Sequence, residues 1–187
     1  MPIPKEKRYT VDEFFNLFFE ESVSERKELI DGVIIELSAP SILHQSISIE
    51  ISSEIRNYIK KNAGSCRVFA APFDVKLDEH NLVMPDISVI CDGSKLFDGK
   101  RCNGSPDWIV EIVSSNWQDD YIKKLDIYQR NGVREYWIID PKYKKTLVYF
   151  FDESHFPNVY TFEMPITVGI YKNNSIQLEI NIAELLN

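Results

Sequence analysis

The stretch Asp107-Trp-Ile-Val-Glu111-Ile-Val-Ser114 places a glutamate in the middle of an apolar run. A run of this kind predicts a strand that is buried on both faces of a sheet. An ionised carboxylate in that setting costs roughly several kcal/mol unless a cation, a metal ion or a proton-transfer role offsets the cost. Glu111 is therefore the first candidate functional residue of the chain.

Two further charged residues belong with Glu111. A second apolar strand is predicted over 86–91 and begins with Asp86, and a helix predicted over 119–131 carries Lys124. Asp120, Lys124 and Tyr128 recur every four residues and so share one face of that helix. The short connection after Ser114 is expected to bring Lys124 toward Glu111, with Asp120 and Tyr128 as accessory residues.

Two strand-borne acids and a lysine suit the metal-dependent hydrolysis of phosphodiesters. Mg²⁺ binds hard oxygen ligands, commonly one or two carboxylates together with water and substrate phosphate. We expect Asp86 and Glu111 to bind Mg²⁺, for which Mn²⁺ can substitute, and Lys124 to orient or deprotonate the attacking water or to neutralise developing charge. The alternatives are a structural ion pair for Glu111, a strand-entry acid for Asp86, and a surface lysine paired with Asp120 for Lys124.

Three other polar residues are weaker candidates. His44 begins a helix predicted over 44–61, where it either touches substrate or a bound water or caps the helix. Glu28 is either an accessory acid or a surface charge on a hairpin predicted over 27–37. Asp107 either shares the metal, since it lies on the same strand face as Glu111, or is a turn acid after Pro106, which is the favoured interpretation.

Length and composition limit the class of protein. The chain has 187 residues, 44% of them hydrophobic, which fits a single globular domain over 1–187. No apolar run is long enough to span a bilayer, and the first residues lack the apolar core of a signal peptide.

The three cysteines show no CxxC spacing, so we expect reduced thiols and a cytoplasmic protein. The net charge of −8 argues against a generic nucleic-acid binder but does not exclude a nuclease, because metal-binding acids contribute to it.

The predicted elements alternate along the chain. A helix over 11–20 begins with a capping box of Thr10 and Glu13, and an antiparallel hairpin is expected over 146–162. Strands are predicted over 67–72, 73–77 and 134–141, the segment 92–105 is expected to be a loop, and 182–186 a last short helix. This order favours an α/β or α+β fold in which helices pack on a sheet.

Several motifs, in order, resemble a known family. They are Tyr9–Phe14, Glu28–Gly32, His44-Gln45, Ala71-Pro72, Pro85-Asp86, Pro106 to Ser114, Asp120 to Tyr128, and Gly132 to Pro141 with its Glu135-Tyr-Trp-Ile-Ile-Asp-Pro141. Together they resemble the PD-(D/E)xK nuclease superfamily and, within it, the bacterial group of predicted restriction endonucleases called the Uma-two family. Each motif alone is weak, but the ordered set covers nearly the whole chain.

The resemblance implies a restriction-endonuclease-like core, a mixed β-sheet flanked by helices, with a Mg²⁺ site and a homodimer. It maps the metal-binding acids onto Asp86 and Glu111. The classical lysine position, two residues after the second acid, is Val113 here, and the family's lysine on the following helix matches Lys124. Ser115 replaces the proline of the family's usual Ser-Pro, which affects a loop and not a ligand.

The leading interpretation is a Mg²⁺-dependent DNA endonuclease that needs no organic cofactor and has no membrane partner. The alternatives are a catalytically inactive module that binds nucleic acid or a protein partner, and a structural dimer with no nucleic-acid role. The complete set of two acids and a lysine favours the nuclease.

Overall fold

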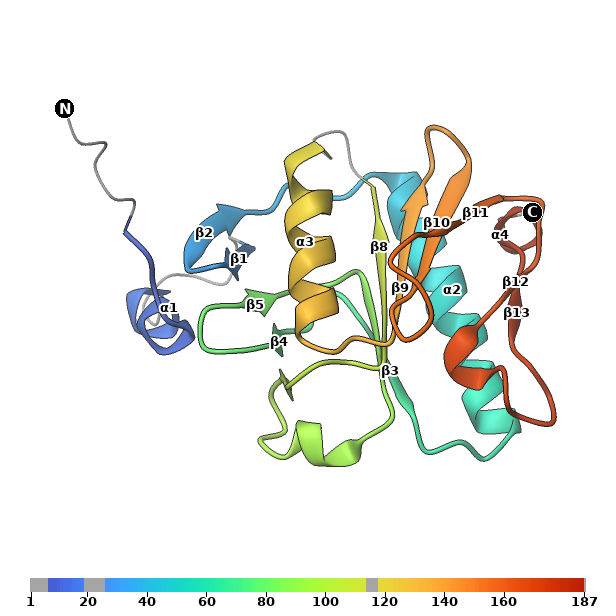
Figure 1. Cartoon of the computed structure of the whole chain (residues 1–187), viewed down its shortest axis with the longest axis horizontal. Coiled ribbons are helices and arrows are strands. Elements are labelled where there is room, and N and C mark those ends of the chain that lie inside the picture. Colours follow the sequence, from blue (N-terminus) through green and yellow to red (C-terminus); the bar gives the residue numbers. More distant parts are fainter. Residues whose placement is uncertain (1–6, 19–25, 114–117, 187) are drawn as a thin grey trace.

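The strand that carries Glu111 lies inside a six-stranded sheet (Figure 1). The computed structural model describes residues 7–18, 26–113 and 118–186, without the side chains of 118–121. The strand order is β11-β10-β9-β8-β6-β3, where β8 pairs parallel with β9 and antiparallel with β6. The bounds are β3 Arg67–Ala70, β6 Ile87–Ile90, β8 Trp108–Ile112, β9 Glu135–Asp140, β10 Lys145–Phe150 and β11 Asn158–Thr161. The mixed sheet confirms the predicted fold class.

Helices cover both faces of β8, as the apolar run predicts. Helix α2 (Ile42–Lys61) carries isoleucines at every fourth position. Ile47, Ile51 and Ile55 lie in one cluster with the side chains of Trp108, Val110 and Ile112. Helix α3 (Gln118–Arg130) packs Ile127 and Tyr128 in a second cluster with Ile109. Since side chains alternate along a strand, Glu111 shares the α3 face with Ile109.

A second, five-stranded sheet lies beside the first and begins with a hairpin. Its order is β2-β1-β5-β4-β7, with bounds β1 Lys27–Ile30, β2 Val33–Glu36, β4 Val75–Lys76, β5 Leu82–Val83 and β7 Cys102–Asn103. The β1–β2 turn has positive φ at both Asp31 and Gly32, the geometry that favours an Asp-Gly hairpin. Helix α1 (Val11–Phe18) packs against this sheet and opens with the predicted capping box, since Glu13 N donates to Thr10 Oγ1 and Thr10 N donates to the Glu13 carboxylate.

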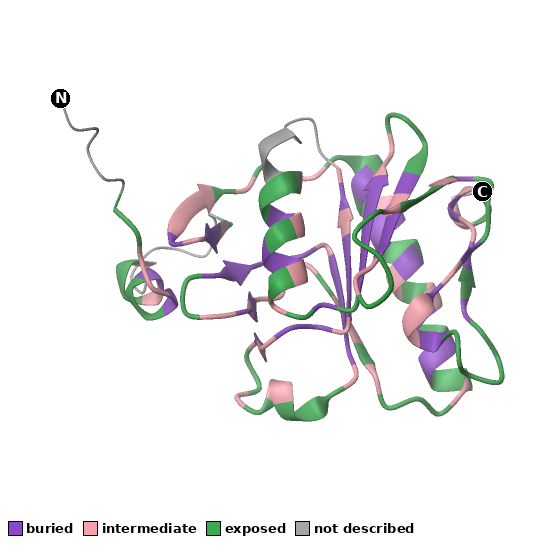
Figure 2. Cartoon of the chain, in the orientation of Figure 1, coloured by how far each residue is buried: buried purple, intermediate pink, exposed green. Residues whose placement is uncertain are grey.

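The remaining elements are short. They are the 3₁₀ helices η1 Gly93–Leu96 and η2 Gly169–Tyr171, the strands β12 Ile166–Thr167 and β13 Glu179–Ile180, and helix α4 Ile182–Leu185. The segment 92–105, expected to be a plain loop, contains both η1 and β7. Figure 2 shows that buried residues concentrate in the sheet strands and on the inward faces of α2 and α3. None of the described helices has the length and apolar character needed to cross a bilayer.

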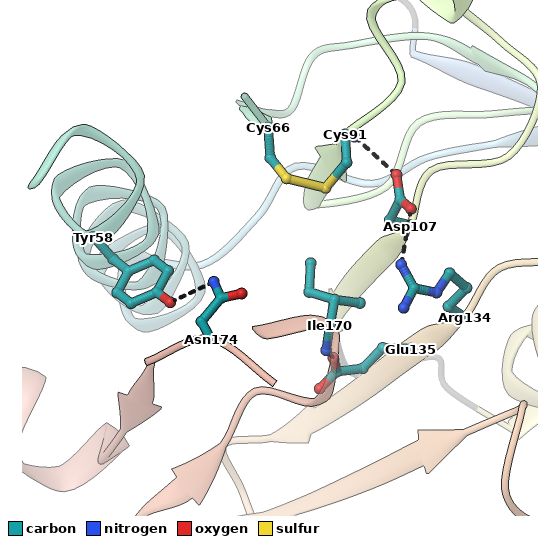
Figure 3. The surroundings of a disulfide bond; sticks show 8 residues. All are labelled: Tyr58, Cys66, Cys91, Asp107, Arg134, Glu135, Ile170 and Asn174. Carbon is teal, nitrogen blue, oxygen red and sulfur yellow. Dashed lines mark hydrogen bonds and ion pairs between the residues drawn. A yellow bond between two sulfur atoms is a disulfide. The ribbon is translucent and has the colours of Figure 1, made fainter. Parts of the chain in front are cut away.

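The prediction of three reduced cysteines is wrong for two of them. Cys66 and Cys91 form a disulfide, while Cys102 is a free, buried thiol (Figure 3). The register Arg67↔Ile90 makes Cys66 and Cys91 the next facing pair of the β3–β6 ladder. They are 25 positions apart, and only the pairing of the two strands makes them neighbours. The cysteines therefore no longer support a cytoplasmic location, which stays a prediction.

Candidate active site

Asp86 and Glu111 lie side by side on adjacent strands. The β6–β8 register pairs Ile87 with Val110, so the next facing pair of the ladder is Asp86 and Glu111. Facing residues of an antiparallel pair point to the same side of the sheet, with Cβ atoms about 5 Å apart. The main chain also fixes Asp86, because the amide N–H of Ile112 donates to its Oδ2 at 2.7 Å. The two predicted acids thus share one site at the end of the β6–β8 ladder.

Helix α3 brings a lysine and a tyrosine onto Glu111. Lys124 Nζ lies 3.0 Å from Glu111 Oε1, and the Tyr128 hydroxyl donates to the same oxygen at 2.7 Å. The spacing of four residues on one helix face produces this pair of donors. Lys124 is only 9% exposed, so the alternative of a surface lysine is wrong.

Glu28, which belongs to the second sheet, is another carboxylate partner of Lys124. Its Oε1 accepts a hydrogen bond from Lys124 Nζ at 3.0 Å and from the backbone amide of Met84 at 2.8 Å. Glu28 is 1% exposed, which rules out the surface-charge alternative. Lys124 therefore bridges two carboxylates, one from each sheet.

His44 reaches the site from α2 and contacts Asp86. Its Nε2 lies 3.0 Å from Asp86 Oδ2, and its Nδ1 is buried without a hydrogen-bond partner among the described residues. His44 does not cap the helix, because the Ser41 side chain accepts from His44 N and α2 begins at Ile42. The imidazole instead fixes the orientation of the Asp86 carboxylate.

Burial and charge act in opposite directions on these groups. Burial raises the pKa of Glu111, Lys124 opposes that rise, and the charges of Asp86 and Glu28 add to it. Burial alone would lower the pKa of Lys124, but the two carboxylates outweigh it and raise this pKa above its usual value. Burial and the charge of Glu111 raise the pKa of Tyr128, so its hydroxyl stays a donor. The set favours a charged ammonium held between the carboxyl groups of Glu28 and Glu111.

A cavity of about 290 Å³ lies beside this cluster. Its wall contains Asp86, Glu111, His44 and Lys124, together with Val113 at the position where the classical motif has its lysine. Arg26 also lines the cavity, although no motif of the sequence singled it out. Arg26 precedes Glu28 by two residues, and the period of two along a strand was a signal that could have placed both on one face.

One accessory candidate, Asp107, does not join the cluster. Asp107 lies at the opposite end of β8, where its carboxylate accepts from Cys91 N at 2.8 Å and pairs with Arg134 at 3.3 Å (Figure 3). That environment agrees with the turn-acid interpretation. The side chain of Asp120 lies outside the described residues.

The donor set fits Mg²⁺ in its preferred mode. Asp86 and Glu111 each offer one oxygen, Oδ1 and Oε2, that accepts no hydrogen bond from a described residue, and two carboxylates with waters satisfy this ion. Over the described residues, no cluster of three or more His, Cys, Asp and Glu side chains is arranged to hold a metal. A site with three protein ligands, as Zn²⁺ requires, is thus not present in that part of the chain.

A mixed sheet flanked by helices, with this site at a strand end, defines the nuclease-like fold of restriction-endonuclease-like proteins. The chain belongs to the Uma2 family, described as "Putative restriction endonuclease", whose sequence model matches residues 11–167.

A solved structure has the same fold. It is described as "a putative nuclease belonging to DUF820" from Anabaena variabilis. It aligns with a TM-score of 0.75 and 24% identity over 98% of this chain and 97% of its own. At that identity the likeness concerns the fold alone. A search of curated proteins finds no match.

Proposed function

We propose that this protein is a Mg²⁺-dependent DNA endonuclease whose site consists of Asp86, Glu111 and Lys124. The observation that carries the proposal is the meeting of two facing strand carboxylates with a buried, doubly paired lysine at the wall of an open cavity. Membership of a family described as restriction endonucleases supports the same reaction class.

Asp86 would hold the ion through Oδ1 and Glu111 through Oε2. Ile112 N and His44 fix the first carboxylate, and Tyr128 fixes the second. When bound, Mg²⁺ stabilises charge on the phosphate and makes a bound water more acidic. The side chains keep their orientation before substrate arrives, which lowers the reorganisation needed in the transition state.

Lys124 would serve as a donor and not as a base. An ammonium group that donates to Glu28 and Glu111 at 3.0 Å each is held in its charged form. Its remaining N–H can orient the attacking water or neutralise the developing phosphorane charge. Of the roles expected from the sequence, water deprotonation is the one that this geometry disfavours.

The test is nicking of supercoiled plasmid DNA with Mg²⁺, Mn²⁺ or excess chelator. We expect cleavage only with the metal, and a loss of at least 100-fold in Asp86→Ala and Glu111→Gln. Glu50→Gln is the matched control, because Glu50 is an exposed acid on α2. Cleavage that persists in chelator or in Glu111→Gln would overturn the proposed metal site, whereas no cleavage by the wild type with either metal would leave the inactive binding module.

The homodimer, the single domain and the cytoplasmic location remain proposals beside this one. Sedimentation at several concentrations tests the dimer, and one cooperative unfolding transition supports the single domain.

A further inference from the structure

The proposed substrate is a polyanion, yet the chain carries a net charge of −8 and its site is built from acids. Phosphate neutralisation by lysine and arginine supplies most of the affinity of DNA-binding proteins. A binding face must therefore concentrate positive charge near the site. The turn between β9 and β10 has the required composition, Pro141-Lys-Tyr-Lys-Lys145, with Lys142, Tyr143, Lys144 and Lys145 all exposed.

The sheet register places this turn at the edge that carries the site. Strand β9 runs parallel to β8 with Glu111 paired to Ile138, so both strands end at the same edge, and Val113 N donates to Ile139 O there. In Figure 1 the β9–β10 turn lies at the same end of the molecule as the carboxyl end of β8. In Figure 2 the turn is coloured as exposed.

Lys145 points to the same face of the sheet as Glu111. Ile138 pairs with both Glu111 and Leu147, and Lys145 is two residues from Leu147, so it keeps the same orientation. Two strand spacings and two residue rises separate Lys145 from Glu111, which is about 12 Å. That distance spans three to four base steps at about 3.4 Å each, within reach of a single bound duplex.

The acids near the turn do not cancel its charge. Asp140 uses Oδ1 to accept the backbone N–H groups of Lys142 and Tyr143, so this carboxylate holds the turn in shape. Glu163 lies close enough that the charge of Lys144 contributes to lowering its pKa, after local hydrogen bonds. The lysines outnumber these acids by three to two.

We propose that the β9–β10 turn, through Lys142, Lys144 and Lys145, binds the phosphate backbone of DNA beside the active site. This inference rests on the proposed function for the identity of the ligand. Arg26 is a further cation at the wall of the cavity itself.

The experiment measures binding apart from cleavage. Fluorescence anisotropy with a labelled DNA duplex, with Ca²⁺ in place of Mg²⁺, compares the wild type with the triple variant Lys142→Gln, Lys144→Gln, Lys145→Gln over a range of salt. We expect at least tenfold weaker binding at moderate salt and a log–log salt slope smaller by about 2 to 3, since each phosphate contact contributes about 0.9. Glu163→Gln should shift the affinity in the opposite direction.

The matched control is the double variant Lys60→Gln, Lys61→Gln. These two exposed lysines lie at the carboxyl end of α2, and His44 of the site lies in its first turn. Equal losses in the control and the triple variant would overturn the inference, as would unchanged binding in the triple variant or no salt-dependent binding by the wild type. Plasmid nicking is recorded in parallel. If the wild type cuts DNA but its binding does not depend on the turn lysines, only the proposal about the turn is rejected. If binding depends on the turn lysines but no DNA is cut, only the proposed nuclease function is rejected.

Discussion

The ammonium group of Lys124 lies 3.0 Å from the carboxylate of Glu28, although the two residues are 96 positions apart in the chain. Glu28 belongs to the five-stranded sheet, and Lys124 packs against the six-stranded one. Their contact joins the two sheets at the cavity and fixes the lysine against Glu111. Long-range packing, and not the local sequence, thus keeps this buried lysine charged.

Removal of Lys124 should affect both cleavage and stability. Lys124→Ala leaves Glu28 and Glu111 buried without their cation, which typically costs about 3–5 kcal/mol. We expect nicking to fall at least 100-fold and the urea midpoint to fall with it. Lys123→Ala is the control, because Lys123 is exposed on the same helix. Equal effects of the two substitutions would contradict the assignment.

Loss of His44 should weaken metal binding more than it weakens folding. Without the imidazole at 3.0 Å, Ile112 N is the one described group that still holds the Asp86 carboxylate, which can then rotate. Removing such a supporting contact commonly lowers metal affinity by about 10–100-fold. The measurement is Mn²⁺ titration of His44→Ala by calorimetry or electron paramagnetic resonance, without DNA. His155→Ala, at an exposed histidine, should bind Mn²⁺ as the wild type does, and an unchanged affinity in His44→Ala would refute this role.

The disulfide should stabilise the fold measurably. It closes a loop across 25 positions between β3 and β6, and a native bridge of this kind is worth about 2–4 kcal/mol. Urea unfolding of Cys66→Ala with Cys91→Ala should show that loss, and a reductant should lower the wild type to the same level. The double variant is its own control, since reductant should leave its midpoint unchanged. A wild type indifferent to reductant would argue against the bond.

Glu135 should make stability fall as pH rises. Burial raises the pKa of Glu135 to about 7 from 4.5, although hydrogen bonds from Gly169 N, Ile170 N and Trp137 Nε1 oppose the shift. The folded state then binds the proton more tightly than the unfolded state does. This contribution is complete below about pH 4.5 and is lost as pH rises toward about 7, by an amount on the order of 3 kcal/mol.

Glu135→Gln removes this titration, so the measurement is the difference in unfolding free energy between wild type and variant from pH 4.5 to 8. The wild type should lose stability relative to Glu135→Gln across that range. Parallel curves for the two proteins would show that Glu135 titrates normally.

Local patterns predicted much of the fold. The apolar run around Glu111 predicted a strand buried on both faces, the isoleucine stripe predicted α2, and Asp31-Gly32 predicted the first hairpin, because each signal lies within a few residues. The four-residue spacing of Lys124 and Tyr128 likewise predicted that both face one partner, and both donate to Glu111.

Features that depend on strand register were not accessible in this way. The β3–β6 pairing that joins Cys66 to Cys91 links segments 25 positions apart, and no local pattern specifies it. The burial of Glu28 depends on how the second sheet packs against α3. The local sequence is therefore compatible with a surface charge on the hairpin, although Glu28 is part of the site. Asp107 shared the strand face of Glu111 but lies four residues away, too far to join the same ion.

The candidate site collects side chains from β1, α2, the start of β6, β8 and α3, which are spread over positions 28 to 124. A chain emerging from the ribosome therefore cannot assemble it until α3 has been synthesised and both sheets have docked. Under the proposed function, a chain that ends before α3 lacks Lys124 and so cannot cut DNA. Under the same proposal, recovery of DNA cleavage after dilution from denaturant would report the formation of the last tertiary contacts of the site, those between α3 and the two sheets.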